Sequence, residues 1–394
     1  MNTLIDRIKQ LSEQYFTDVL AMRRHIHMHP ELSYQEAETA SFVRAQLERA
    51  GIPCQTGIAG HGITAFIAGK NPEARLIALR ADMDALPIHE QNDVAYKSKR
   101  DGIMHACGHD VHTSSLLGAA LILHELRNEW EGTVQLVFQP AEEVLPGGAS
   151  LMLKDGLFAK RTPDSIFGQH VYPELPAGKV GMRSGVYMAS TDELYVTVKG
   201  RGGHGAKPER NIDPVLIASH LIVALQQVVS RWSSPTMPSV LSFGKVIANG
   251  ATNIIPNEVR LEGTFRTFDE RWRKEAHQRM VALAEGLVKG MGGEVDFRIE
   301  VGYPVLKNDV ELTEKARLSA IAYLGESNVL DLDMRMTAED FAYYGHEMPG
   351  CFYRLGTSSP DNESKSYSIH HPRFDIDEEA LKTGMGLMAW MAVN

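Results

Sequence analysis

A change in strand pattern along the chain is the strongest constraint on its fold. Before residue 184, the expected strands are nearly continuous apolar runs, such as TVQLVF at 133–138. Such runs suit a sheet that is covered by helices on both faces. Further on, VDFRIEV at 295–301 alternates apolar and polar residues, which suits a sheet covered on one face only. The sequence therefore predicts two sheets of different kinds.

The middle segment predicts a compact unit of its own. Its expected order is β-α-β-β-α-β, which is that of the ferredoxin-like unit. The first of its helices opens with Asp213 and Pro214, a capping residue followed by a first-turn proline. The predicted strands are 192–199, 239–247, 258–266 and 294–301, and the helices are 213–230 and 270–289.

The flanking segments predict a larger α/β domain with a mixed sheet. The expected helices are 3–27, 36–50 and 112–127, and the expected strands are 63–68, 75–80, 133–138 and 351–355. We therefore expect an α/β protein whose larger domain, residues 1–186 and 302–394, is interrupted by the ferredoxin-like unit at 187–301. Hinges are expected near Gly185 and Gly302.

Composition excludes several classes of protein. The chain has 394 residues and a net charge of −10, without a Lys/Arg-rich run that would indicate nucleic-acid binding. We see no apolar run of the roughly 18 residues needed to span a membrane, and no secretory signal at the start. Three cysteines are too few for a disulfide framework, so we expect a reducing, cytoplasmic location.

The strongest chemical signal is HACGHDVH at 105–112, which holds His105, Cys107, His109, Asp110 and His112. Imidazole and thiolate are common metal ligands, and the Cys-x-His spacing lets both side chains reach one centre. Polar residues at the start of a helix would be the ordinary interpretation, but three histidines and a cysteine within eight residues favour a metal site. A nucleophilic cysteine is the alternative, and it would need a nearby base and no metal.

Acidic residues follow two of the predicted strands. Glu142 and Glu143 come after strand 133–138, and Asp82 and Asp84 come after strand 75–80. Sites in open α/β sheets lie at the carboxyl ends of strands. One glutamate of the pair would bind metal while the other serves as a general base, and an aspartate would orient a metal-bound histidine. Taken alone, each pair also fits a solvated loop or a turn.

Further histidines are more ambiguous. His170 and the pair His370–His371 stand near strand ends and are candidate distant ligands. The alternating histidines of HIHMHP, at 25, 27 and 29, lie in the N-terminal helix and are interpreted as structural.

Together the motifs resemble those of the M20 metallopeptidases, specifically the amidohydrolase branch with its hippurate, auxin-conjugate and N-acetyl-diaminopimelate hydrolases. The resemblance runs over nearly the whole chain. The motifs, in order, are RRHIHMHPELSYQE, RADMDALPIHE, HACGHDVHTSSLLGAA, FQPAEE, GQHVYP, GRGGHGAKP, TNIIPNEV, GTFRTF, TAEDFAYY and HHPRFDID.

The resemblance implies a two-metal centre and a role for each matching residue. Glu142 would be the general base and Asp84 a partner that orients a ligand. Where the wider family has His-x-Asp, this chain has Asp82-x-Asp84, so Asp82 is not an expected ligand. Zinc and manganese both suit the ligand types. The implied ligands are Cys107, His109, Glu143, His170 and His370.

The inserted unit would be a lid and a dimerisation domain. The resemblance implies that His204 reaches the active site of a partner subunit, so that the enzyme works as a homodimer. Asn253 and Arg266 would be further donors from the lid, with Arg266 pairing with a substrate carboxylate.

We therefore expect an enzyme that cleaves the amide bond of N-acyl amino acids through a metal-activated water. A dipeptidase or aminoacylase of the same family is the alternative within this class. A protein that only binds metal or a partner is the alternative outside it, although the presence of Glu142 favours catalysis.

Overall fold

The structure is a computed structural model and describes residues 3–359 and 367–394. The chain forms two compact units. The first consists of Met1–Tyr187, Lys307–Asp333 and Asp340–Asn394, and the second of Met188–Leu306 and Met334–Glu339. Each unit has its own hydrophobic core.

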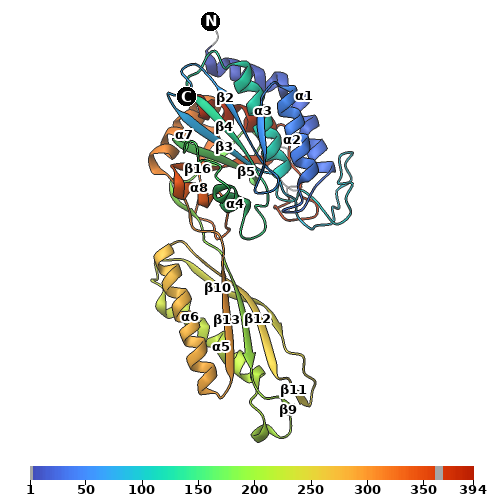
Figure 1. The fold of residues 1–394 in the computed structure, drawn as a ribbon, viewed down its shortest axis with the longest axis vertical. Coiled ribbons are helices and arrows are strands. Elements are labelled where there is room, and N and C mark those ends of the chain that lie inside the picture. The colour runs from blue at the N-terminus through green and yellow to red at the C-terminus, as the bar shows by residue number, and fades with distance from the viewer. Residues whose placement is uncertain (1–2, 360–366) are drawn as a thin grey trace. The chain divides into compact units, whose positions relative to one another are not determined.

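The first unit is built on an eight-stranded mixed sheet with the order β1-β2-β4-β3-β5-β16-β6-β15 (Figure 1). Its four central strands, β4, β3, β5 and β16, run parallel to one another. Their carboxyl ends therefore meet at one edge of the sheet. The strand bounds are β1 (Cys54–Ile58), β2 (Gly62–Ala68), β3 (Leu76–Asp82), β4 (Thr133–Gln139), β5 (Ser165–Pro176), β6 (Val180–Met182), β15 (Val329–Asp331) and β16 (Gly350–Ser358). The short strands β7 (Gly185–Met188) and β14 (Leu306–Asn308) form a separate pair.

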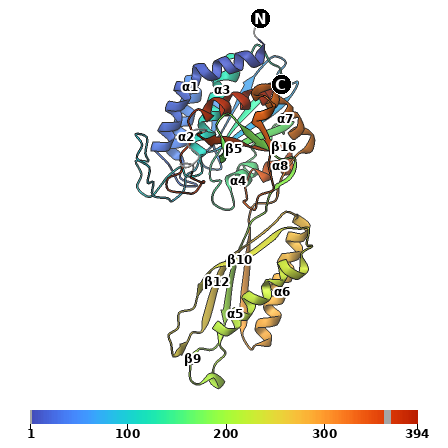
Figure 2. The same cartoon turned by 180° about the vertical axis from the view of Figure 1, so that it is seen from behind.

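Both faces of this sheet are covered, as the apolar strand runs predict. On one face, Leu79, Phe167 and Tyr353 join the large core, and α1 and α3 lie together along this unit in both views (Figures 1 and 2). On the other face, Phe341 packs against Phe352 with ring centroids 5.1 Å apart. The helix bounds are α1 (Leu4–Met28), α2 (Ala37–Arg49), α3 (His109–Glu125), α4 (Gly148–Lys154), α7 (Val310–Leu324), α8 (Ala342–Glu347) and α9 (Ala380–Val393).

The second unit has the predicted β-α-β-β-α-β order around a four-stranded antiparallel sheet, β10-β12-β8-β13. Both long helices pack on the same face of this sheet, because Ile217 of α5 and Met280 of α6 share a core with Val196 of β8. The bounds are β8 (Asp192–Lys199), α5 (Pro214–Leu225), β10 (Ser239–Ile247), β12 (Glu258–Thr267), α6 (Glu270–Gly290) and β13 (Glu294–Val301), with the short pair β9 (Gly203–His204) and β11 (Ile254–Ile255).

The helix α5 begins as predicted but ends early. The Asp213 carboxylate caps it by accepting hydrogen bonds from the backbone of Val215 and Leu216. The helix ends at Leu225, and a π-helical turn follows at Val228–Trp232.

The stretch Pro214–Trp232 is long and apolar enough to cross a membrane by length and composition. The expectation that no run reaches that length was therefore wrong at this place. One face of the stretch packs into the core of the second unit through the fully buried Leu221 and Leu225. Other apolar side chains of the stretch, such as Leu216 and Val223, remain exposed.

Candidate metal centre

Most of the predicted site residues lie together at the carboxyl edge of the first unit's sheet. Asp84 follows β3, Glu142 and Glu143 follow β4, and His170 lies within β5. The three strands are neighbours, with Asp82 opposite Gln139 and Arg80 opposite Gly168. The fold therefore gathers side chains that are far apart in the sequence.

The start of α3 determines the directions of Cys107 and His109, the residues on either side of Gly108. The helix begins at His109, three residues before the predicted start at 112. Gly108 has φ +80°, and a Cβ there would come within 2.5 Å of the Val171 side chain. Only glycine fits this conformation and this approach to β5. Cys107 and His109 are thereby turned toward the same edge of the sheet.

His109 presents one free nitrogen to the centre. Its Nδ1 lies 3.1 Å from Asp84 Oδ1, which fixes the ring, and its buried Nε2 has no hydrogen-bond partner in the part of the chain that the structure describes. Burial opposes protonation of this ring, but Asp82 and Asp84 outweigh it and raise the pKa of His109 to about 10. The surroundings are therefore strongly attractive to a cation.

Two groups of candidate ligands meet at Cys107. Its Sγ lies 3.5 Å from His170 Nε2 and 3.3 Å from His370 Nε2. His370 Nε2 is in turn 3.4 Å from Glu143 Oε1, a buried oxygen with no hydrogen-bond partner among the described residues. The ligand atoms of each group, Cys107–His109–His170 and Cys107–Glu143–His370, lie within 4.8 Å of one another. Unpartnered imidazole and carboxylate atoms around a thiol are a donor set that fits divalent metal ions.

His170 and His370, the ligand candidates far from Cys107 in the sequence, are each fixed by a hydrogen bond outside the ligand groups. His170 Nδ1 donates to the carbonyl of Val171 at 2.8 Å, so its Nε2 is directed at Cys107. The backbone N–H of His370 donates to Ala106 O at 2.7 Å, which ties this residue to the loop before α3. Its neighbour His371 stacks on Tyr367, with ring centroids 4.4 Å apart.

The thiol of Cys107 is unsuited to act as a nucleophile in metal-free protein. Burial, followed by the charges of Glu143 and Glu142, raises the pKa of Cys107 well above its ordinary value. The thiol therefore stays protonated at neutral pH unless a cation is bound, whereas the thiolate is the reactive form. This environment favours a metal ligand over the alternative of a cysteine nucleophile.

A third cluster, Asp82–His109–His112, has ligand spacing but is engaged in hydrogen bonds. His112 Nδ1 donates to Asp82 Oδ1 at 2.6 Å, and its Nε2 accepts from the Val171 backbone at 2.9 Å. Asp82 also pairs with Arg80 at 2.6 Å. Both nitrogens of His112 are thus used within the protein.

The two adjacent glutamates face different partners. Glu142 is buried, and one of its oxygens accepts from the Asp340 backbone at 3.4 Å. The backbone N–H of Glu143 donates to Asp84 Oδ2 at 3.0 Å. Asp84 therefore contacts both His109 and the segment that carries the glutamates.

The remaining predicted residues belong to the second unit. His204 and Asn253 are neighbours there, because β9 pairs with β11 and Gly205 N donates to Asn253 O at 2.9 Å. Arg266 lies apart from them on β12, where its Nη1 donates to Met336 O at 3.1 Å.

The alternating histidines of α1 are not part of the cluster. His27 is fully buried, and its ring nitrogens lie 2.8 Å from Asp110 and 3.2 Å from Glu90. His25 stacks on Phe42 instead, with ring centroids 4.2 Å apart. These contacts fit the structural interpretation of His25 and His27.

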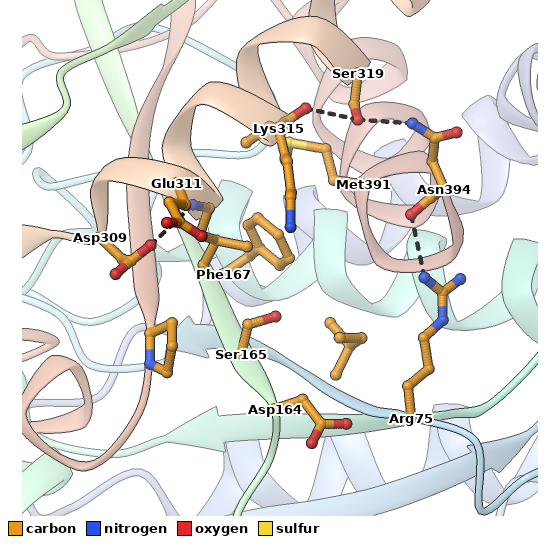
Figure 3. Close-up of a pocket in the computed structure, with 14 residues that line it drawn as sticks. Arg75, Asp164, Ser165, Phe167, Asp309, Glu311, Lys315, Ser319, Met391 and Asn394 are labelled. Carbon is orange, nitrogen blue, oxygen red and sulfur yellow. Dashed lines mark hydrogen bonds between the residues drawn. The ribbon is translucent and has the colours of Figure 1, made fainter.

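A separate cavity of about 360 Å³ lies at the opposite ends of the parallel strands (Figure 3). Its lining includes Arg75 and Ser165, at the starts of β3 and β5, and Lys315 of α7. Sites in open α/β sheets form at the carboxyl ends of the strands, so this cavity is not the place expected for catalysis.

An open α/β sheet with buried thiol, imidazole and carboxylate groups at its carboxyl edge defines a candidate metalloprotein. Residues 78–394 match the model of peptidase family M20/M25/M40. The chain belongs to peptidase family M20.

Named relatives match most of the chain. An N-acetylcysteine deacetylase of Bacillus subtilis is 40% identical over 380 residues, which are 96% of this chain and 97% of that protein. An N-acyl-L-amino acid amidohydrolase of Geobacillus stearothermophilus is 42% identical over 305 residues, or 77% of this chain and 82% of the relative. The structure is also similar to that of YxeP from Bacillus subtilis, which is described as a dinuclear metal binding peptidase from the M20 family. The TM-score is 0.82 at 37% identity, and the match covers 96% of this chain and 98% of YxeP.

Proposed function

We propose that this protein is a metal-dependent amidohydrolase that cleaves N-acyl amino acids into a carboxylic acid and a free amino acid. The observation that carries the proposal is the pair of ligand groups that meet at Cys107, with Glu142 beside them. The amidohydrolase and the deacetylase among the relatives support the same reaction class.

The donor set supports two divalent ions, zinc or manganese. Cys107, His109 and His170 would form one group of ligands, and Glu143 and His370 would complete the other with Cys107. Asp84 would orient His109 by accepting from its Nδ1. When bound, the ions would acidify a water and polarise the amide carbonyl.

Glu142 is the proposed general base. It would take a proton from the attacking water and then deliver a proton to the leaving amine nitrogen. Its buried position next to Glu143 supports this role, because burial limits exchange of that proton with solvent.

The second unit, Met188–Leu306 with Met334–Glu339, is proposed to act as a lid and a dimerisation domain. The sequence-based limits for this division are 187–301 for the lid and 1–186 with 302–394 for the catalytic domain. His204 would stabilise the oxyanion from the partner subunit, Asn253 would add a donor, and Arg266 would bind the substrate carboxylate. Exposed apolar side chains on the second unit support a homodimer, which we place in the cytoplasm.

The test is hydrolysis of a panel of N-acetyl amino acids, N-benzoyl amino acids and free dipeptides. Each substrate is assayed after removal of metal and again after addition of Mn²⁺ or Zn²⁺. We expect amino-acid release from the acylated substrates only with metal present. Preference for free dipeptides would favour the dipeptidase alternative, and absence of turnover with metal still bound would overturn the proposal.

A further inference from the structure

The segment between α1 and α2 contacts both loops that carry the proposed catalytic carboxylates. We call residues 31–36 the strap. Along the loop after β3, Ala85 N donates to Glu31 O at 2.8 Å and Ser33 Oγ donates to Asp84 Oδ2 at 2.7 Å. The strap is therefore fixed to the residue that orients His109.

The end of the strap holds the residue before Glu142. Glu36 is fully buried, and its Oε1 accepts from Ala141 N at 2.7 Å. Ala141 has φ +50°, in the left-handed region that residues other than glycine rarely adopt. Such a conformation persists only where its surroundings impose it. The bond from Glu36 is one contact that imposes it.

The strap also holds the residue after the glutamate pair. Tyr34 Oη donates to Val144 O at 2.9 Å, and Tyr34 N donates to Glu36 Oε1 at 3.0 Å. Glu142 and Glu143 thus lie between two anchors, Ala141 and Val144, that contact the same strap.

The burial and incomplete hydrogen bonding of the Glu36 carboxyl group are unusual for a structural residue. Its Oε2 is buried without a hydrogen-bond partner among the described residues. Burial, followed by the charge of Asp84, raises the pKa of Glu36 to about 7. A buried carboxyl group with an unsatisfied oxygen is costly to the fold, and such groups cluster at functional sites.

We propose that Glu36 and Tyr34 are positioning residues that hold Glu142 in place for proton transfer by fixing the backbone on both sides of it. This inference rests on the proposed function only in taking Glu142 as the general base. The contacts between the strap and the two loops are observed whatever the role of Glu142.

The first test compares Glu36→Ala with Glu36→Gln. Loss of the acceptor in Glu36→Ala should lower kcat by about 10- to 100-fold, because small misplacements of a catalytic group cost that much. KM and the metal content should stay within about twofold of the wild type. Glu36→Gln keeps an acceptor oxygen for Ala141 and should recover most of the lost kcat. Glu38→Ala, which removes an exposed carboxylate of α2, is the matched control and should match the wild type.

Two further variants separate positioning from general damage. Tyr34 is 37% exposed, and Tyr34→Phe removes only the hydrogen bond of its hydroxyl group. The variant should therefore fold, and it should lower kcat by a smaller factor than Glu36→Ala does. In a Glu142→Ala background, Glu36→Ala should cause no further loss of the residual rate, because both act through one group. Additive losses, or a Glu36→Gln variant as slow as Glu36→Ala, would overturn the proposal.

Amide hydrogen exchange tests the positioning without any substrate. In the wild type and in Glu36→Gln, the peptide that covers residues 139–148 should exchange slowly, and in Glu36→Ala it should exchange faster. Unchanged exchange in Glu36→Ala would contradict the positioning role whatever the activity. A wild-type protein that hydrolyses none of the panel would instead contradict the proposed function and leave this measurement intact.

Discussion

A single buried carboxylate, Asp192, joins three elements of the second unit. Arg273 and His277, one turn apart on α6, contact its two oxygens at 2.6 Å and 2.7 Å, and Gly302 N lies 3.4 Å away just after β13. Burial opposes ionisation of this group. The hydrogen bonds from His277 and Arg273 outweigh the burial and lower the pKa of Asp192.

At pH 7 the Asp192→Asn variant should lose about 2 kcal/mol of stability, because it removes the charged hydrogen bonds from Arg273 and His277 to a buried carboxylate. Arg273 would keep only its second carboxylate partner, the more exposed Glu270. The pKa of Asp192 is lowered on folding, so its contribution is present above the unfolded pKa of about 3.9 and fades as the pH falls further. Thermal unfolding of the wild type and of Asp192→Asn, followed between pH 7 and pH 3, measures this contribution to stability.

The difference between the two unfolding midpoints should shrink below about pH 4. Asp296→Asn, at an exposed position of β13, serves as the control and should shift the midpoint little at any pH. A difference between the unfolding midpoints of the wild type and Asp192→Asn that stays constant down to pH 3 would show that the charge of Asp192 does not stabilise the fold.

At the scale of elements, α5 and β10 present apolar side chains to solvent. Val223 of α5 is 72% exposed, Leu216 of α5 is 52% exposed, and Val246 of β10 is 56% exposed. The strand β10 is also an end strand of its sheet. Exposed apolar side chains next to a sheet edge are typical of an interaction surface.

Val223→Glu should convert the proposed dimer into a monomer, because it places a charge in an apolar interface. Light scattering coupled to size-exclusion chromatography measures the mass of each species. Leu318→Glu, at a 66% exposed position of α7 in the first unit, is the matched control and should leave the dimer intact. A wild-type monomer, or a dimeric Val223→Glu, would contradict dimerisation through this surface.

At the scale of the whole molecule, the features that could be predicted are those that depend on short stretches of sequence. The bounds of strands 192–199, 239–247 and 294–301 match those of β8, β10 and β13, because alternation along a strand is a local signal. The gathering of Asp84, Glu143 and His170 at one edge of the sheet was also predictable, since their segments follow or form the neighbouring parallel strands β3, β4 and β5. The place of Cys107 beside them was expected only from the family resemblance.

Features that depend on distant contacts were missed. The early start of α3 depends on the approach of Gly108 to Val171 in another element. The bond from Ala141 to Glu36 joins residues 105 apart in the sequence, so no local pattern reports it. The roles of His204, Asn253 and Arg266 remain predictions.

The central claim is that Glu142 transfers protons while its neighbour Glu143 binds metal. The most direct measurement is the metal content of Glu142→Ala and Glu143→Ala together with their turnover of the best N-acyl substrate. We predict that Glu142→Ala keeps two ions per chain and loses about 10³-fold in kcat, as expected for removal of a general base. Glu143→Ala should lose bound metal as well as activity. Loss of metal from Glu142→Ala, or turnover near that of the wild type, would contradict the account.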